Sequence, residues 1–184
     1  MIKNKLLWIG LISILLVTAC QNQAQPEPSA NTSLALMLED SITDYLVTNI
    51  GITSFGGEAF CAYELLDAEP ATEGNLYIWA LCQEYDVEHG SLTTGSGISL
   101  PVALQTQAKN DHYEIIGHLV PGDGTYYGPD VRAIFPKSSW PQIMPQDEDE
   151  INQYNSRANK LQEETRMQAE VYYQSKIENC GKAQ

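Results

Sequence analysis

Four carboxylates stand where their spacing could support metal binding or acid–base chemistry. Glu84 and Asp86 alternate in "QEYDVEHG", and Asp123 and Asp130 stand in "PGDGTYYGPD". Alternate side chains of a strand share a face but lie about 6.6 Å apart, so Glu84 and Asp86 converge on one cation only where the strand bends. The simpler interpretation is a solvated strand end for the first pair and a tight turn for the second. We therefore predict no metal site.

The histidines and serines form no recognisable catalytic motif. His89, His112 and His118 are the only histidines, and no H-x-x-x-H pair occurs. The stretch "TTGSGIS" at 93–99 places a serine between glycines, but a nucleophile elbow requires G-x-S-x-G, and we interpret it as a hairpin turn. No phosphate loop or dinucleotide fingerprint is present, so we expect no cofactor.

The N-terminus has the layout of an export signal. The basic start "MIKNK" precedes the uncharged run "LLWIGLISILLV", which is too short for a membrane span of about 20 residues. The following residues, Val17-Thr18-Ala19-Cys20, resemble the lipobox of bacterial lipoproteins. The alternative is an ordinary signal peptide in which Cys20 is incidental.

The lipoprotein resemblance implies a membrane address. It implies that Cys20 is acylated on sulfur, that a signal peptidase cuts between Ala19 and Cys20, and that the chain is anchored in the cell envelope, outside the cytoplasm. Gln21 after the cysteine implies the outer membrane if the host is Gram-negative. Each buried CH₂ contributes about 0.8 kcal/mol, so two or three acyl chains anchor a protein durably.

Three other cysteines are available for a disulfide. An antiparallel hairpin centred near residues 71–72 would place Cys61 directly opposite Cys82, and an exported chain meets oxidising conditions. A bridge from either cysteine to Cys180 and free, buried thiols are the alternatives.

The charge balance excludes polyanionic partners. The formal net charge is −14, and between residues 28 and 131 Lys109 is the only lysine or arginine. Such a surface repels nucleic acid and anionic lipid headgroups. Membrane attachment must therefore depend on the lipid on Cys20, and the remaining partners are a protein or a glycan.

The apolar pattern predicts two helices and a four-stranded sheet. Residues 33–51 and 148–178 show helical spacing, with Ser33 as an N-cap of the first helix. Short connections between the strand-like runs favour an antiparallel meander, in which Pro101 indicates an edge or a bulge. The runs are 58–66, 75–87, 97–107 and 112–120.

We therefore expect an α+β protein with one folded domain. The predicted organisation is a signal peptide at 1–19, a lipidated Cys20 with a flexible tether to residue 33, and a single domain at 34–184. The helix-then-meander order over residues 33–120 resembles the cystatin-like roll, although the Gln-x-Val-x-Gly tip of inhibitory cystatins is absent.

The first functional hypothesis is a non-enzymatic envelope lipoprotein that presents an acidic binding or scaffolding domain. The alternative is an envelope hydrolase that uses Glu84 or Asp123 with a histidine in a sheet cleft. Tyrosines and tryptophans along the strands suit either a packed core or a partner surface.

Overall fold

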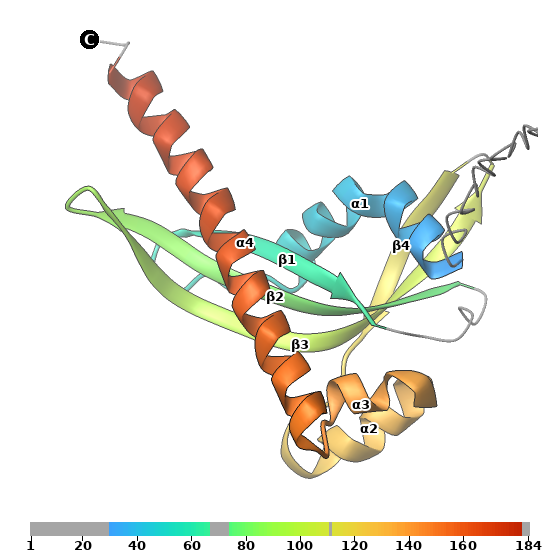
Figure 1. The fold of residues 1–184 in the computed structure, drawn as a ribbon. Helices are drawn as coiled ribbons and strands as arrows, with labels where there is room; N and C mark the ends of the chain where they lie inside the picture. The colour runs from blue at the N-terminus through green and yellow to red at the C-terminus, as the bar shows by residue number, and fades with distance from the viewer. Residues whose placement is uncertain (1–29, 67–73, 111, 182–184) are drawn as a thin grey trace, which may run out of the picture.

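The computed structural model describes residues 30–66, 74–110 and 112–181, and its α+β architecture has the predicted element order (Figure 1). The signal-peptide segment 1–19, Cys20 and most of the predicted tether lie outside these residues. The elements are α1 (Ala30–Asn49), β1 (Glu58–Leu65), β2 (Asn75–Glu88), β3 (Ser91–Lys109), β4 (His112–Leu119), η1 (Gly124–Tyr126), α2 (Tyr127–Ile134), η2 (Lys137–Ser139), α3 (Trp140–Ile143) and α4 (Glu148–Gly181).

The sheet is the predicted antiparallel meander, with strand order β1-β2-β3-β4. The turn between β2 and β3 lies at His89–Gly90, where both residues have positive φ (52° and 79°), as a two-residue hairpin turn requires. The hairpin turn predicted at "TTGSGIS" is therefore wrong, because those residues lie inside β3. Pro101 lies in β3 before β4 begins to pair at Ala103, on the predicted open edge.

Each face of the sheet carries its own helical layer. Along β2, Leu76, Ile78 and Ala80 point to the face covered by α1, where Leu38 and Ile42 are buried against them. The alternate residues face the opposite side and pack against α2, α3 and α4 (Figure 1). This period of two explains why β2 is an almost continuous apolar run, since both of its faces are covered.

Helix α1 confirms the predicted apolar face, although its start differs from the prediction. Leu38, Ile42 and Leu46 are buried, but the helix begins at Ala30, so Ser33 lies inside it and not at its N-cap. The helix ends where the Gly51 N–H donates to the Leu46 carbonyl at 2.8 Å, a bond that closes the last turn.

Helix α4 confirms the second predicted helix and crosses β1 and β2 on the face opposite α1 (Figure 1). Leu161, Thr165 and Ala169 form its buried stripe. Ile151, near the start of the helix, is 45% exposed and lies outside this stripe. No helix among the described residues is long and apolar enough to cross a membrane.

Candidate functional site

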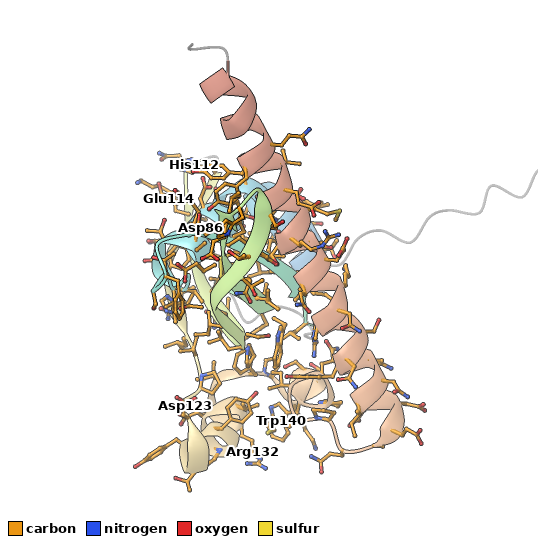
Figure 2. All side chains as sticks on the ribbon, turned by 90° about the vertical axis from the view of Figure 1, so that its left-hand side faces the viewer. Asp86, His112, Glu114, Asp123, Arg132 and Trp140 are labelled. Carbon is orange, nitrogen blue, oxygen red and sulfur yellow. A yellow bond between two sulfur atoms is a disulfide. The ribbon has the colours of Figure 1, made fainter. Side chains whose placement is uncertain are left out.

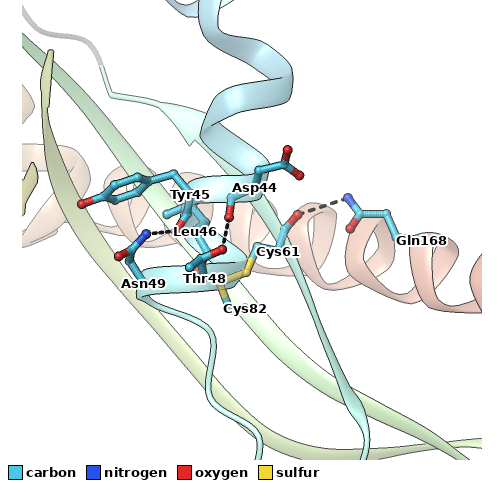
Figure 3. Close-up of a disulfide and its surroundings, with 8 residues drawn as sticks. All are labelled: Asp44, Tyr45, Leu46, Thr48, Asn49, Cys61, Cys82 and Gln168. Atoms are coloured by element: carbon cyan, nitrogen blue, oxygen red, sulfur yellow. Dashed lines mark hydrogen bonds between the residues drawn. A yellow bond between two sulfur atoms is a disulfide. The ribbon is translucent and has the colours of Figure 1, made fainter. Parts of the chain in front are cut away.

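Cys61 and Cys82 form a disulfide between β1 and β2, as the hairpin geometry predicted (Figure 3). Their Cα atoms are 4.1 Å apart, close to the spacing of a pair that does not hydrogen bond in an antiparallel ladder. Both side chains are buried beneath α1. Because each of these cysteines is already bridged, neither is paired with Cys180.

Glu84 is not at a solvated strand end, because its side chain is completely buried. Its carboxylate accepts four backbone N–H bonds of 2.9 Å, from Ser54, Phe55, Gly57 and Ser96. Burial alone raises the pKa of Glu84, but the four hydrogen bonds outweigh it and lower the pKa to about 2. The carboxylate therefore stays charged and joins the segment after α1 to β3.

The surrounding backbone is shaped to receive this carboxylate. The β2–β3 pairing shifts register between Gln83 and Tyr85, which is the bend that turns Glu84 inward. A Cβ on Gly95 would lie 2.6 Å from Glu84 Oε2, and a Cβ on Gly57 would lie 2.2 Å from the Tyr85 carbonyl oxygen. Glycine at 57 and 95 is thus needed for close approach rather than for a turn.

The other predicted carboxylates do not converge with Glu84 or with one another. Asp86 accepts the N–H of Val87 at 2.8 Å, and Asp130 accepts the N–H of Gly122 at 2.9 Å. Figure 2 shows that Asp86, on strand β2, lies far from Asp123. Within the part of the chain that the structure describes, no group of three or more His, Cys, Asp or Glu side chains is placed to hold a metal ion.

The histidines lie in three different settings. His89 is in the β2–β3 turn, and His118 Nδ1 lies 2.9 Å from the Tyr45 hydroxyl. His112 Nε2 lies 3.2 Å from Glu114 Oε1, and Lys109 donates to the same carboxylate. Hydrogen bonds from Lys109 and then His112 lower the pKa of Glu114. Among the described residues, the acid–histidine pair is therefore His112–Glu114, and the sequence did not single out Glu114.

The aromatic side chains divide between the two interpretations. Tyr77, Trp79 and Tyr85 are buried in the core, whereas Tyr113 in β4 and Tyr126 in η1 are exposed. The Tyr85 hydroxyl lies 3.2 Å from Thr165 Oγ1 and so ties β2 to α4.

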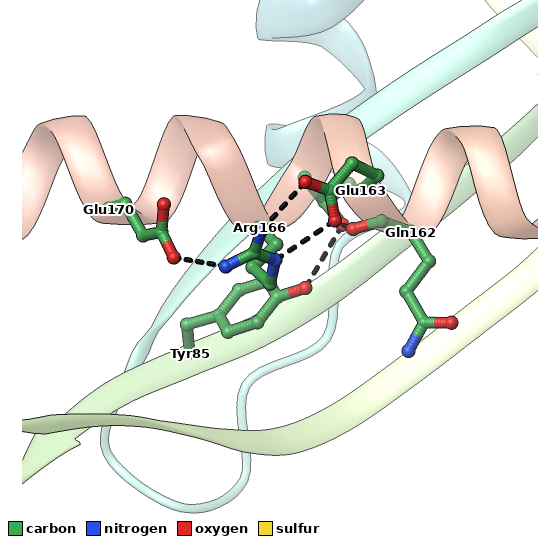
Figure 4. A network of polar contacts seen from close by, with 6 residues as sticks. Tyr85, Gln162, Glu163, Arg166 and Glu170 are labelled. Carbon is green, nitrogen blue, oxygen red and sulfur yellow. Dashed lines mark hydrogen bonds and ion pairs between the residues drawn. The ribbon is translucent and has the colours of Figure 1, made fainter.

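The neighbouring turn of α4 carries a surface ion cluster (Figure 4), in which Arg166 bonds to Glu163 and Glu170. These exposed pairs contribute little to stability.

A groove that brings several elements together follows the outer edge of β1. We call it the β1-edge groove, and its volume is about 430 Å³. It is lined by Glu39 and Thr43 of α1, residues 61–65 of β1, and Lys160, Glu164 and Gln168 of α4. Because β1 is an end strand of the sheet, the groove has a strand edge as its floor and a helix on either side.

The β1-edge groove is acidic. Lys160 Nζ lies 3.1 Å from Glu64 Oε2, which neutralises the only basic side chain of the lining. Glu39 and Glu164 form no ion pair within the described residues. Burial raises the pKa of Tyr63 on the groove floor, and the negative charges of Glu39 and Asp40 raise it further. The potential in the groove therefore favours positively charged groups.

A second groove, of about 590 Å³, separates α1 from β4. Ser41 of α1 lines it together with His112 and Glu114 of β4. The His112 and Glu114 side chains are 59% and 40% exposed, so this pair remains hydrated.

Comparison of this chain with protein-family models, curated proteins and solved structures gave no match.

Proposed function

We propose that this protein is a lipid-anchored envelope protein whose acidic α+β domain is a binding module without catalytic activity, and that it binds a partner protein in the β1-edge groove. The observation that carries the proposal is the groove itself, in which a strand edge lies open between two helices. Its volume lies within the range of ordinary ligand sites, about 300 to 1,000 Å³.

The arrangement of the ionisable side chains supports a binding role. The Glu84 carboxylate is engaged by four backbone N–H groups, and a pKa of about 2 keeps it far from the range in which a general acid or base works. Asp130 supports the turn at Gly122. Glu84 and Asp130, two of the acids considered as catalytic or metal-binding candidates, thus have defined structural roles.

The lipoprotein resemblance supports the membrane part of the proposal. The segment Val17-Thr18-Ala19-Cys20 supplies the acylation site, and the strongly acidic composition gives the domain no electrostatic affinity for anionic headgroups. An anchored domain is held at the membrane surface, which raises the effective concentration of a partner in the same envelope.

The hydrolase alternative has one observation in its favour, the His112–Glu114 pair beside Ser41. The sequence-based hypothesis instead assigned the catalytic acid to Glu84 or Asp123. Both side chains are well exposed, and the lowered pKa of Glu114 makes its carboxylate a weaker general base. The binding role is therefore the better supported proposal.

Site-specific photo-crosslinking in living host cells tests the binding role. A photoreactive amino acid replaces Thr43 in the groove or, as the matched control, Thr125 in the exposed helical segment η1. We expect a discrete protein adduct from position 43 and none from position 125. The same adducts from both positions, or none from either, would show that the groove is not the partner surface.

A further inference from the structure

The β1 edge presents a defined set of backbone groups to the groove. In an antiparallel ladder, alternate residues either bond to the neighbouring strand or direct their N–H and C=O away from it. Leu66 N donates to the Tyr77 carbonyl at 3.0 Å, which places Ala62, Glu64 and Leu66 in the bonded set. Cys61, Tyr63 and Leu65 are then the residues whose N–H and C=O point into the groove.

One of these outward groups already has a partner from α4. Gln168 Nε2 donates to the Cys61 carbonyl at 3.2 Å, as Figure 3 shows. A side-chain amide thus occupies the place that the N–H of a neighbouring strand would take. The contact confirms that the Cys61 carbonyl points away from β2, and it closes one end of the exposed edge. Tyr63 and Leu65 remain as the positions where another strand can pair.

The two walls of the groove place negative charge on both faces of such a strand. Glu39 lies on the α1 side and Glu164 on the α4 side. Successive side chains of a strand point to opposite faces. Two adjacent basic residues of the added strand would therefore point to opposite walls. Each would meet a carboxylate that forms no ion pair among the described residues.

Building on the proposed function, we infer that the occupant of the β1-edge groove is an extended, basic segment of a partner protein, which adds to the sheet as a fifth strand and bonds to the backbone of Tyr63 and Leu65. Main-chain bonds supply affinity in this mode, and the wall charges supply specificity. A second copy of this chain is a poor occupant, because pairing two β1 edges brings two acidic grooves together.

The test uses amide hydrogen exchange on the full chain in neutral detergent. The probe is the acetylated and amidated peptide Thr-Val-Lys-Lys-Val-Thr, whose adjacent lysines match the two walls. At about ten times the dissociation constant, binding slows exchange about tenfold. We expect this slowing at the amides of Tyr63 and Leu65 and not at Ala62 and Glu64, which already pair with β2.

Two control peptides separate the main-chain and charge contributions. A control peptide with N-methylated valines cannot donate main-chain hydrogen bonds from those residues. A control peptide with Glu-Glu in place of Lys-Lys carries the opposite charge at its centre. We expect neither control peptide to slow exchange at Tyr63 or Leu65 at the same concentration. Equal slowing by the methylated control peptide would overturn strand addition, and equal slowing by the acidic control peptide would overturn the basic specificity.

A pair of substitutions isolates one backbone donor. Tyr63→Ala and Tyr63→Pro both remove the aromatic ring, but only Tyr63→Pro also removes the N–H that points into the groove. An edge strand tolerates proline at a position whose N–H faces away from the neighbouring strand. Because both variants lack the ring, the comparison between them isolates the N–H, and we expect Tyr63→Pro to bind the lysine peptide at least about tenfold more weakly than Tyr63→Ala. An intact Cys61–Cys82 bridge and an unchanged circular dichroism spectrum verify that each variant is folded.

The remaining outcomes are equally informative. No slowing with the lysine peptide, or slowing confined to β4, overturns the inference. Concentration-dependent slowing without peptide identifies a second copy as the occupant. A photo-crosslink at Thr43 without slowing at Tyr63 and Leu65 overturns strand addition while leaving the binding module supported.

Discussion

At the scale of single residues, the most informative feature is Glu84, a charged side chain that is fully buried. Glu84 has none of its surface exposed, yet its carboxylate is compensated by backbone N–H groups from two segments that are far apart in sequence. A buried carboxylate requires such compensation, because unpaired burial of the charge costs far more than hydrogen bonding returns. Glu84 therefore fixes the position of residues 54–57 against β3.

The pH dependence of stability follows from the lowered pKa of Glu84. Its pKa falls from an ordinary value of 4.5 to about 2 on folding, so the folded state favours the charged form. This contribution to stability is complete above pH 4.5 and is lost as the pH falls from 4.5 towards 2. The protonated carboxyl can no longer accept all four N–H bonds equally well.

We predict that Glu84→Gln lowers the melting temperature by several degrees at pH 7, because an amide donor replaces one of the accepting oxygens. The difference from the parent should shrink as the pH falls from 4.5 towards 2. Thermal unfolding followed by circular dichroism between pH 7 and pH 2 measures both effects. Glu114→Gln is the matched control, since its carboxylate is exposed and should change the melting temperature little. A constant difference between Glu84→Gln and parent over this range would contradict the assignment.

At the scale of elements, the β1–β2 hairpin is held in register by its disulfide. The bridge joins residues 21 apart, and closing a loop of this length stabilises the folded state by about 3 kcal/mol in the chain-entropy account. We predict that the double variant Cys61→Ala, Cys82→Ala loses about this much free energy of unfolding, measured by denaturant titration.

Cys180→Ala is the control for the bridge, because Cys180 is not the partner of either hairpin cysteine. We expect its midpoint and slope in the denaturant titration to match those of the parent. A loss equal to that of the double variant would show that Cys180 takes part in the bridge in solution.

In the β2–β3 hairpin, Gly95 leaves the space that the Glu84 side chain occupies. A Cβ at Gly95 would lie 2.6, 2.8 and 3.0 Å from three atoms of the fixed Glu84 side chain. We predict that Gly95→Ala costs about 1 to 3 kcal/mol of unfolding free energy, measured in denaturant, as overpacking generally does.

Gly117→Ala serves as the matched substitution in the neighbouring strand β4. Its closest contact would be 2.7 Å, to Oε1 at the end of the Gln105 side chain, and the next atom of that side chain would lie 3.8 Å away, so the amide can move aside. The reduced entropy of the unfolded chain offsets part of the contact, so we expect a loss below about 1 kcal/mol. Equal losses from both variants would contradict the special role of Gly95.

Sequence patterns predicted the elements better than the contacts between them. The spacing of Leu38, Ile42 and Leu46 identified α1 because one buried face repeats with the helical period. The opposition of Cys61 and Cys82 followed from hairpin symmetry, a local property. The extent of β3 was missed because Gly95 and Gly97 have the composition of a turn, and the tertiary position of Glu84 explains why the strand carries glycine at position 95.

The candidate site was missed for a related reason. The β1-edge groove depends on α1 and α4 lying on opposite faces of one strand, and no spacing within the sequence encodes that meeting. Acidic residues 39 and 164 are ordinary solvent-facing residues within their own helices. A pattern shows which face of a helix is buried, but not which polar residue of another helix will lie across from it.

At the scale of the whole molecule, the net charge and the proposed anchor would act together. The chain carries 24 acidic and 10 basic side chains, so the folded domain is repelled by anionic headgroups and by copies of itself. If the domain is tethered to a membrane whose anionic surface repels it, the β1-edge groove stays accessible to partner proteins in the same compartment. No helix among the described residues is long and apolar enough to cross a bilayer, and in the proposed function the membrane affinity resides in acyl groups on Cys20.

We therefore predict that Cys20→Ser abolishes incorporation of radioactive palmitate and leaves the precursor unprocessed by the lipoprotein pathway. Cys180→Ser, which leaves the lipobox intact, should label and fractionate with membranes like the parent. Because one acyl chain alone holds only marginally, partial acylation should appear as a divided population, partly in the membrane and partly in the aqueous fraction. Equal palmitate labelling of Cys20→Ser and parent would remove Cys20 as the anchor, and recovery of the natural protein without acyl groups would remove the envelope role itself.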